Sequence, residues 1–302
     1  MLKLLKSLFT KLFNKFLSVF QKPKDLEYFC NLSTKLKSSS LKPTTLHTRK
    51  SLHKTLFKFF PKIPLSKLTK IHIYEAINKL ISQKLKPSTI KQIISYAKDG
   101  FNLALELGIV SKNPIPNRLP KLKPTIKTNK TIKMQDIKKL LNHSKGELKI
   151  FLYFAFFTGA RASEILAITK NDINFKKNYI TISKNATRFG LCTTKNGQSR
   201  KIFLPLTLKQ IIIESNFSSF KKDYFAIYYQ FKKLKKLLNI KIGNIHSARH
   251  TYASICLHNN INLPFIAELL GHNNINMISK VYSHNIHSLK EQKKLSKILI
   301  FK

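Results

Sequence analysis

The sequence predicts a mainly α-helical protein with a small antiparallel β-sheet, arranged as two domains. Over most of the chain, apolar residues recur at helical spacing, and proline or glycine interrupts that spacing at intervals of helix length. A stretch around residues 179–204 instead alternates apolar and polar residues, as strands do. Pro116, Pro120 and Pro124 lie among lysines and separate the two helical regions.

Residues 1–22 are expected to form a basic amphipathic helix, because apolar residues recur every three or four positions from Leu2 to Phe20. Lysines interrupt this apolar run, unlike the continuous apolar core of a secretory signal. Such a helix can lie on a membrane surface. We favour a helix packed on its own domain or on a neighbouring subunit, because the apolar stripe is wide enough for a core face.

Residues 23–117 predict a helical domain, and residues 118–131 predict an extended, basic linker. The expected helices of this domain are Leu26–Leu36, Thr44–Phe60, Thr69–Lys84 and Thr89–Leu107. Pro61 closes the second helix, Thr69 is the expected N-cap of the third, and Gly108 ends the fourth.

Residues 132–302 predict a second domain that mixes helices with a few strands. The first expected elements are helices at Asp136–Asn142, Glu147–Phe157 and Ala162–Ile168, and a strand at Tyr179–Ser183. Two further strands, Leu191–Thr194 and Lys201–Leu204, flank the pair Asn196-Gly197, which strongly favours a hairpin turn between them. After Pro205 the pattern is helical to the end of the chain.

The net charge of +43, from 56 basic and 13 acidic residues, predicts a polyanionic partner because such a chain repels itself. Nucleic acid is the first candidate, and an anionic membrane surface is the second. Nearly all of the basic residues are lysines, a bias that an AT-rich genome also produces. The arginines are more informative, since a planar guanidinium grips two phosphate oxygens at once. They are Arg49, Arg118, Arg161, Arg188, Arg200 and Arg249.

Three widely spaced cysteines, Cys30, Cys192 and Cys256, form neither a disulfide framework nor a CxxC metal motif. We therefore expect free thiols in a reducing cytoplasm. The longest uncharged apolar stretch, residues 150–160, is too short to span a bilayer, so no membrane span is expected. Nothing in the sequence resembles a P-loop, an acidic two-metal cluster or a zinc site, and we expect no metal and no cofactor.

Four segments carry groups suited to phosphodiester chemistry: residues 158–164 (TGARASE), 194–201 (TKNGQSRK), 246–250 (HSARH) and 270–284, which begins LGH and contains VYSH. The groups belong to Arg161, Lys195, His246, Arg249, His272 and Tyr282. Together they can hold a phosphodiester, neutralise its transition state and attack it with a tyrosine. Taken one at a time, these residues have simpler interpretations. Arg161 could form a surface ion pair with Glu164, and Lys184 or Lys201 could fill the role assigned to Lys195.

Local pattern places several of these groups where they can act. Arg161 stands at an expected helix start, where free amide groups favour anions. His246 and Arg249 are three residues apart and share one face of a helix, and a histidine exchanges protons near neutral pH. Tyr282 needs nearby positive charge or a base to attack, because a free phenol has a pKa of about 10.

In their order along the chain and in their residue patterns, these segments resemble the motifs of the tyrosine recombinase (phage integrase) family. The resemblance implies that residues 23–117 form a SAM-like core-binding domain that binds DNA, and that residues 132–302 form an α+β catalytic domain. By this resemblance, Arg161 and Arg249 hold the phosphate, and Tyr282 is the nucleophile. Lys195 protonates the leaving 5′ oxygen, while His246 and His272 transfer protons and form hydrogen bonds. Glu164 is a supporting residue.

The resemblance further implies a site-specific recombinase that cuts and rejoins double-stranded DNA through a 3′-phosphotyrosyl intermediate, as a homo-tetramer on two DNA sites. The tail Ser288–Ile300 resembles a C-terminal helix that docks onto a neighbouring subunit, and packing on its own domain is the alternative. A Xer-type role in resolving chromosome dimers and a role in mobile-element integration both stay open. The need for a second recombinase or an accessory protein also stays open.

Two other functions compete with this one. Tyr282 lies ten residues after His272, one more than relatives usually show, and this spacing favours a catalytically silent DNA-binding relative. The segment 186–193 also looks longer than in common relatives, which leaves open the register of the hairpin that carries Lys195. A type IB topoisomerase-like enzyme would share the chemistry, but the core-binding domain and the C-terminal tail favour the recombinase.

Overall fold

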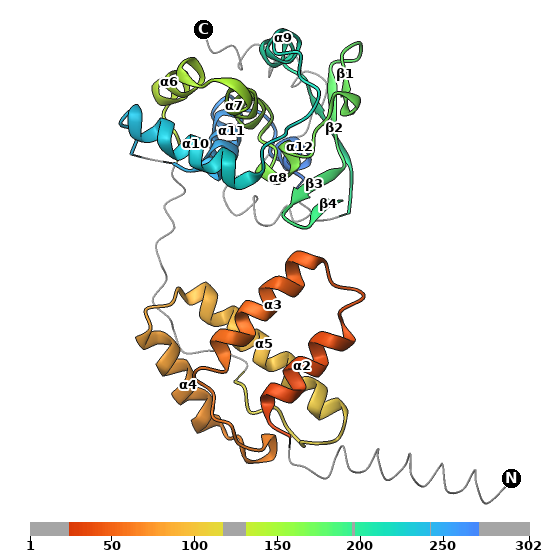
Figure 1. The fold of residues 1–302 in the computed structure, drawn as a ribbon, viewed down its shortest axis with the longest axis vertical. Helices are drawn as coiled ribbons and strands as arrows, with labels where there is room; N and C mark the ends of the chain where they lie inside the picture. The colour runs from red at the N-terminus through yellow and green to blue at the C-terminus, as the bar shows by residue number, and fades with distance from the viewer. Residues whose placement is uncertain (1–23, 117–130, 195–196, 242, 272–302) are drawn as a thin grey trace, which may run out of the picture. The chain divides into compact units, whose positions relative to one another are not determined.

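The computed structural model describes residues 24–116, 131–194, 197–241 and 243–271. The chain divides into two compact units, Met1–Lys127 and Thr128–Lys302 (Figure 1). The amphipathic helix expected at residues 1–22, the linker at 118–131 except for its last residue, and the tail at Ser288–Ile300 lie outside the described residues.

The N-terminal unit is built around one long helix, α5. Its elements are α2 (Leu26–Leu36), α3 (Pro43–Leu56), the 3-10 helix η1 (Leu65–Lys67), α4 (Lys70–Ser82) and α5 (Pro87–Glu106). Helices α2 and α3 both pack against α5 (Figure 1). The fully buried side chains of Phe29, Ile77 and Phe101 lie in the core between the helices.

All four helices predicted for this unit are present. The second ends at Leu56 rather than at the predicted Phe60: the N–H groups of Phe59 and Phe60 both donate to the Leu56 carbonyl in a closing turn, and Pro61 disfavours helical backbone at Phe60. The fourth begins at Pro87, since proline lacks the N–H that a first helical turn leaves unpaired. Thr69 is the N-cap residue of α4, as predicted.

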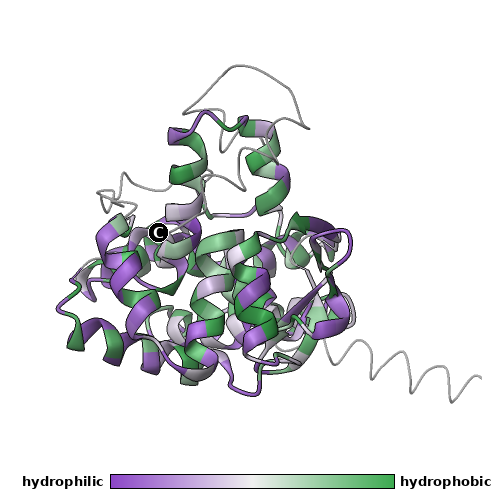
Figure 2. Cartoon of the chain, turned by 90° about the horizontal axis from the view of Figure 1, so that it is seen from above, coloured by the Kyte–Doolittle hydropathy of each residue, from purple (hydrophilic) through white to green (hydrophobic). Residues whose placement is uncertain are grey.

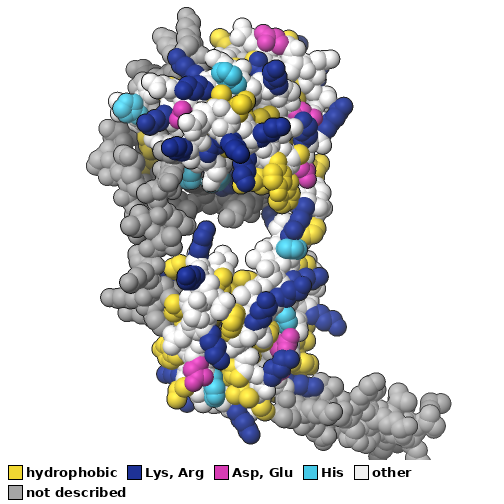
Figure 3. All heavy atoms as spheres, turned by 60° about the vertical axis from the view of Figure 1, so that its left-hand side comes forward, with side chains coloured by type: hydrophobic (Ala, Val, Ile, Leu, Met, Phe, Trp, Pro, Cys, Tyr) yellow, Lys and Arg dark blue, Asp and Glu magenta, His cyan; other side chains and the backbone are white. Residues whose placement is uncertain are grey.

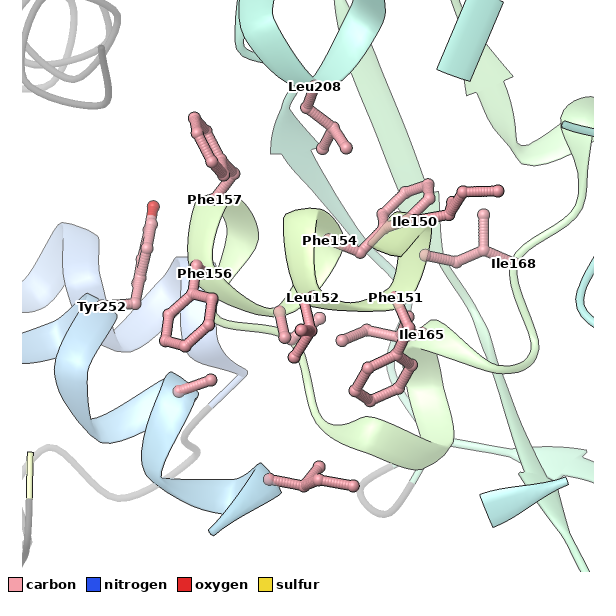
Figure 4. Close-up of a cluster of buried hydrophobic side chains, with 14 of the residues drawn as sticks. Ile150, Phe151, Leu152, Phe154, Phe156, Phe157, Ile165, Ile168, Leu208 and Tyr252 are labelled. Atoms are coloured by element: carbon pink, nitrogen blue, oxygen red, sulfur yellow. The ribbon is translucent and has the colours of Figure 1, made fainter. Parts of the chain in front are cut away.

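The C-terminal unit surrounds one buried helix, α7 (Gly146–Thr158). Its other helices are α6 (Met134–His143), α8 (Ala162–Ile165), the 3-10 helix η2 (Lys170–Asp172), α9 (Leu206–Glu214), α10 (Tyr224–Leu237), α11 (Ile245–His258) and α12 (Leu263–Leu270). Phe151, Phe154 and Phe157 of α7 and Tyr252 of α11 lie in one apolar core (Figure 4). Helices elsewhere in the chain carry apolar and polar residues in turn, as amphipathic helices do (Figure 2).

Helix α8 is shorter than the predicted Ala162–Ile168. The N–H of Ala167 donates to the carbonyl of Glu164 at 3.1 Å, and the N–H of Ile168 donates to that of Ile165 at 3.0 Å. These bonds reach back three residues instead of four, a tightening that commonly closes a helix.

In the described part of this unit, five short strands form two separate antiparallel sheets. One sheet has the order β1 (Ile173–Asn174), β2 (Tyr179–Ile182), β5 (Arg200–Phe203), and the other is a hairpin of β3 (Lys184–Thr187) and β4 (Gly190–Thr193). The expected strand at residues 179–183 is therefore present, and it is the central strand of its sheet.

The predicted hairpin across Asn196-Gly197 is wrong. The strands on either side of that pair belong to different sheets, although the Gly197 N–H still donates to the Thr194 carbonyl at 3.1 Å. Buried Ile202 of β5 lies opposite buried Ile180 of β2, and this apolar pair fixes the partner of β5. Strand β4 pairs instead with the nearer β3. Burial thus outweighed the local preference of the turn.

Candidate active site

A tight turn from α7 holds Arg161 at the start of α8. Gly159 ends α7 in the left-handed conformation with φ of 63°, and Arg161 is the N-cap residue of α8. A Cβ on Gly159 would lie 2.4 Å from Cδ1 of Tyr252 and 2.9 Å from Cδ2 of Leu270. Glycine is needed here both for the backbone angle and for the space between α11 and α12.

Replacing Gly159 by alanine is expected to lower the free energy of unfolding by about 3 kcal/mol or more, because a left-handed alanine must also overlap the Tyr252 ring. Gly146→Ala is the matched control: its φ is 56°, but nothing lies within 4 Å of its Cβ. We expect the control to cost about 1 kcal/mol. Urea unfolding of both full-length variants measures the difference, and equal losses would contradict the close contact.

Glu164 is a fully buried carboxylate that accepts hydrogen bonds from two arginines. Its Oε2 accepts from the Arg161 N–H at 2.8 Å, and its Oε1 accepts from Nη1 of Arg161 at 2.9 Å. Nη1 and Nη2 of Arg200 donate to Oε1 at 3.1 Å and to Oε2 at 2.6 Å. Burial raises the pKa of Glu164, but the hydrogen bonds and charge of Arg200, together with Arg161, outweigh burial and lower that pKa.

Arg249 reaches the same place from α11, and it is almost completely buried, with 5% of its surface exposed. Its Nη1 donates to the Gly159 carbonyl at 3.0 Å, and its Nη2 donates to the Leu270 carbonyl at 2.6 Å. Burial, followed by repulsion from Arg161, lowers the pKa of Arg249 to about 9. The guanidinium therefore stays charged at neutral pH.

Arg161 and Arg249 converge on the C-terminal end of α12. Nη1 and Nη2 of Arg161 donate to the carbonyls of Leu270 at 3.5 Å and Gly271 at 3.3 Å. The Leu270 carbonyl thus accepts from both arginines, and carbonyls at a helix C-terminus carry the negative end of the helix dipole. Two arginines predicted from separate sequence segments are brought to one point.

His246 lies in the first turn of α11, one helical turn before Arg249, and its side chain is partly exposed. Its ring meets the His250 ring edge-on, with centroids 5.0 Å apart. Partial burial, then the charges of His250, Arg249 and Arg161, lower the pKa of His246 below its ordinary value of 6.5. The imidazole is therefore neutral at pH 7 and is able to accept a proton.

The other three predicted site residues, Lys195, His272 and Tyr282, lie outside the described residues. The described residue next to His272 is Gly271, which ends α12 in the left-handed conformation with φ of 64°. Its carbonyl accepts from Arg161, so the chain passes the arginine cluster immediately before residue 272.

Sequence reasoning did not assign Arg200 to the site. It lies on β5, and its Nε donates to the Leu269 carbonyl at 2.7 Å while its two Nη atoms bind Glu164. The available signal was its place among only six arginines, within the segment 194–201. The direction in which the Arg200 side chain points depends on the pairing of β5 with β2. The turn signal at Asn196-Gly197 had predicted a different partner for that strand.

The described part of the chain contains neither a cluster of metal ligands nor a membrane-spanning helix. Within residues 24–116, 131–194, 197–241 and 243–271, no three His, Cys, Asp or Glu side chains gather as metal ligands would. Among the helices in those same ranges, none has the length and apolar character needed to cross a membrane.

Residues 130–288 match the model of the phage integrase family, and residues 26–81 match that of the phage integrase N-terminal SAM-like domain. The chain belongs to the phage integrase family. The predicted resemblance to tyrosine recombinases is thereby confirmed.

Relatives in the phage integrase family cover most of the chain. A protein named tyrosine recombinase XerC-like, from Caldanaerobacter subterraneus subsp. tengcongensis, is 27% identical over 268 residues, covering 74% of this chain and 68% of the relative. A probable integrase/recombinase of Acholeplasma phage L2 is 29% identical over 259 residues, covering 79% of this chain and 86% of the relative. A cellular and a viral member are thus similarly distant.

Solved integrases share the fold. The Tn1549 transposon integrase, in complex with a circular intermediate DNA, superposes with a TM-score of 0.73 at 20% identity, covering 88% of this chain and 98% of that one. A lambda integrase, solved as a tetramer bound to a Holliday junction, superposes with a TM-score of 0.70 at 17% identity, covering 88% and 81%. The predicted fold class, mainly helical with small antiparallel sheets, is therefore confirmed.

Proposed function

We propose that this chain is a site-specific DNA recombinase that cuts and rejoins strands through a 3′-phosphotyrosyl intermediate. The observation that carries the proposal is the convergence of Arg161 and Arg249 on the Leu270 carbonyl, with His246 one helical turn from Arg249. Two fixed guanidiniums and a neutral imidazole are the groups that a phosphodiester needs as it gains charge in a transition state.

The proposed reaction exchanges one phosphoester bond for another. The Tyr282 phenol oxygen attacks the phosphorus while the bond to the 5′ oxygen breaks, and Lys195 protonates that leaving oxygen. Arg161 and Arg249 hold the non-bridging oxygens, while His246 and His272 transfer protons and donate hydrogen bonds. A 5′ hydroxyl of another strand then reverses the step. Because the phosphotyrosyl bond replaces the phosphodiester, the exchange needs no external energy source.

Double-stranded DNA is the proposed partner. The chain carries a net charge of +43, and Lys and Arg side chains crowd the visible face of each unit while Asp and Glu are sparse (Figure 3). Such a charge favours phosphate backbones and makes binding steeply dependent on salt. We propose a homo-tetramer on two DNA sites, with exchange of the tail Ser288–Ile300 between subunits, acting in the cytoplasm.

The test of this function is a nicked suicide substrate, from which the cleaved 5′ end diffuses away and leaves the protein attached. Candidate sites come from random duplex DNA selected by binding to the full-length protein. We expect a protein–DNA adduct that survives denaturing electrophoresis and disappears on protease treatment. Tight, specific binding without any adduct would instead favour the catalytically silent relative, the alternative that the spacing from His272 to Tyr282 suggests.

The adduct should form at a rate that falls in acid, with its midpoint below pH 6.5. Because the pKa of His246 is lowered, the neutral ring that accepts a proton predominates at pH 7 and is lost as pH falls through that pKa. Single-turnover rates at DNA concentrations well below saturation, between pH 5 and pH 8, measure the profile of the free protein. His246→Gln should be slower and lack this acid limb, and an unchanged limb in the variant would contradict the role of His246.

A further inference from the structure

Glu164 is shared unequally by its two arginine partners. Arg200 meets the carboxylate with both terminal nitrogens, at 3.1 Å and 2.6 Å, in the two-pronged geometry that suits a guanidinium. Arg161 uses one terminal nitrogen on Glu164, at 2.9 Å, and directs the other to the Gly271 carbonyl. Arg200 therefore occupies the edge of the carboxylate that would otherwise accept Arg161 in the same way.

Arg200 is mounted rigidly and faces inward. It lies opposite Ile182 in the pairing of β5 with β2, and its side chain is only 10% exposed. Its Nε donates to the Leu269 carbonyl at 2.7 Å. A Cβ on Gly271 would lie 2.8 Å from Nη1 of Arg200, so the guanidinium also packs against the end of α12. Because the Arg200 guanidinium is enclosed in this way, it contacts protein groups and has little exposed surface for a ligand.

The four hydrogen bonds to Glu164 fill the carboxylate, which has about four acceptor positions. Without Arg200, two of those positions open inside a buried pocket. The nearest cation able to fill them is Arg161, which already touches Oε1. Its second terminal nitrogen would then turn from the Gly271 carbonyl toward the carboxylate, and this rotation would also disturb the contact of Nη1 with the Leu270 carbonyl that Arg161 shares with Arg249.

We propose that Arg200 is a positioning residue: by saturating Glu164 and anchoring the end of α12, it keeps Arg161 aimed at the phosphate. This inference rests on the proposed function for what Arg161 binds. The role is distinct from that of a phosphate ligand, because Arg200 acts through Glu164 and α12.

A double-mutant cycle tests the route through Glu164. Arg200→Gln should slow adduct formation at saturating suicide DNA by about 100-fold, the scale of a misplaced catalytic group, while the Kd for DNA changes less than about threefold. In a Glu164→Gln background the same change should slow the reaction by less than about threefold, because its target is already neutral. Arg188→Gln, at the exposed turn between β3 and β4, is the matched control for loss of one guanidinium. Losses that multiply would overturn the proposal.

A second measurement needs no DNA. With only six arginines in the chain, ¹⁵N-arginine labelling gives six Nε–H signals in an NMR spectrum, assigned by single substitutions. Arg200→Gln should shift the Arg161 signal and weaken binding of inorganic phosphate at Arg161 by about tenfold, whereas Arg188→Gln should do neither. An Arg161 signal that ignores Arg200→Gln would overturn the inference.

The two arms also separate this inference from the proposed function. A wild-type protein that forms no adduct, but whose Arg161 signal responds to Arg200→Gln, would refute strand cleavage and leave the positioning role standing. If Arg200→Gln does not fold, Arg200→Lys replaces it, because lysine keeps the charge but cannot bind both carboxylate oxygens. The expected direction of each readout is the same.

Discussion

Replacing Tyr282 by phenylalanine is expected to abolish the covalent adduct while changing the affinity for DNA less than about twofold. The reason is chemical: in the proposed reaction the phenol oxygen forms the bond to phosphorus, and phenylalanine has no oxygen that can do so. Electrophoresis of full-length protein after incubation with suicide DNA measures the adduct, and binding of an uncleavable duplex measures the affinity.

Other tyrosines define the controls for this experiment. Tyr229 on α10 is 64% exposed, so Tyr229→Phe makes the same change outside the site and should leave the adduct intact. Tyr252 is not a rival nucleophile, because it is buried in the core and burial raises the pKa of its phenol well above the ordinary value. If Tyr282→Phe still forms an adduct, the nucleophile lies elsewhere, and the ten-residue spacing after His272 becomes the first suspect.

Arg249→Gln is expected to slow adduct formation by about 100- to 1000-fold at saturating DNA, the usual loss when one preorganised donor to a developing charge is removed. The Kd for DNA should change little, because one buried cation is a small part of a charge of +43. Arg249→Lys should still be slower than wild type by at least roughly tenfold, since an ammonium lacks the fork that reaches two acceptors.

Single-turnover rates of the two variants, measured below their unfolding temperatures, check this order. Arg188→Gln again removes one guanidinium, from an exposed turn, and should stay close to wild type. Rates of Arg249→Gln within about threefold of wild type would contradict its role as a phosphate ligand.

The helices and the two converging arginines were accessible from the sequence because their signals are local. Apolar spacing with proline and glycine punctuation located the helices, and it placed Arg161 at the start of the helix where the structure has it. The three-residue spacing of His246 and Arg249 placed both on α11. None of these inferences needed knowledge of which elements pack together.

The features that sequence reasoning missed depend on distant parts of the chain. The partner of β5 was decided by the burial of Ile202 against Ile180, which no local turn preference reveals. Arg200 inherits its direction from that pairing, so its contact with Glu164, 36 residues away in sequence, became visible only with the fold. A buried carboxylate shared by two arginines is a tertiary property.

The Leu270 carbonyl that Arg161 and Arg249 share limits the side-chain entropy that these arginines would lose on binding a ligand. Fixing a long side chain such as arginine costs up to about 2 kcal/mol in rotamer entropy. For Arg161 and Arg249 that loss belongs to folding, because main-chain oxygens of α12 already hold both guanidiniums. In the proposed reaction, a phosphate oxygen would replace a carbonyl oxygen as the partner of a guanidinium that is already ordered. A phosphate bound as proposed would therefore meet a rigid arginine cluster, and selectivity would follow from fixed geometry rather than from adaptation to the ligand.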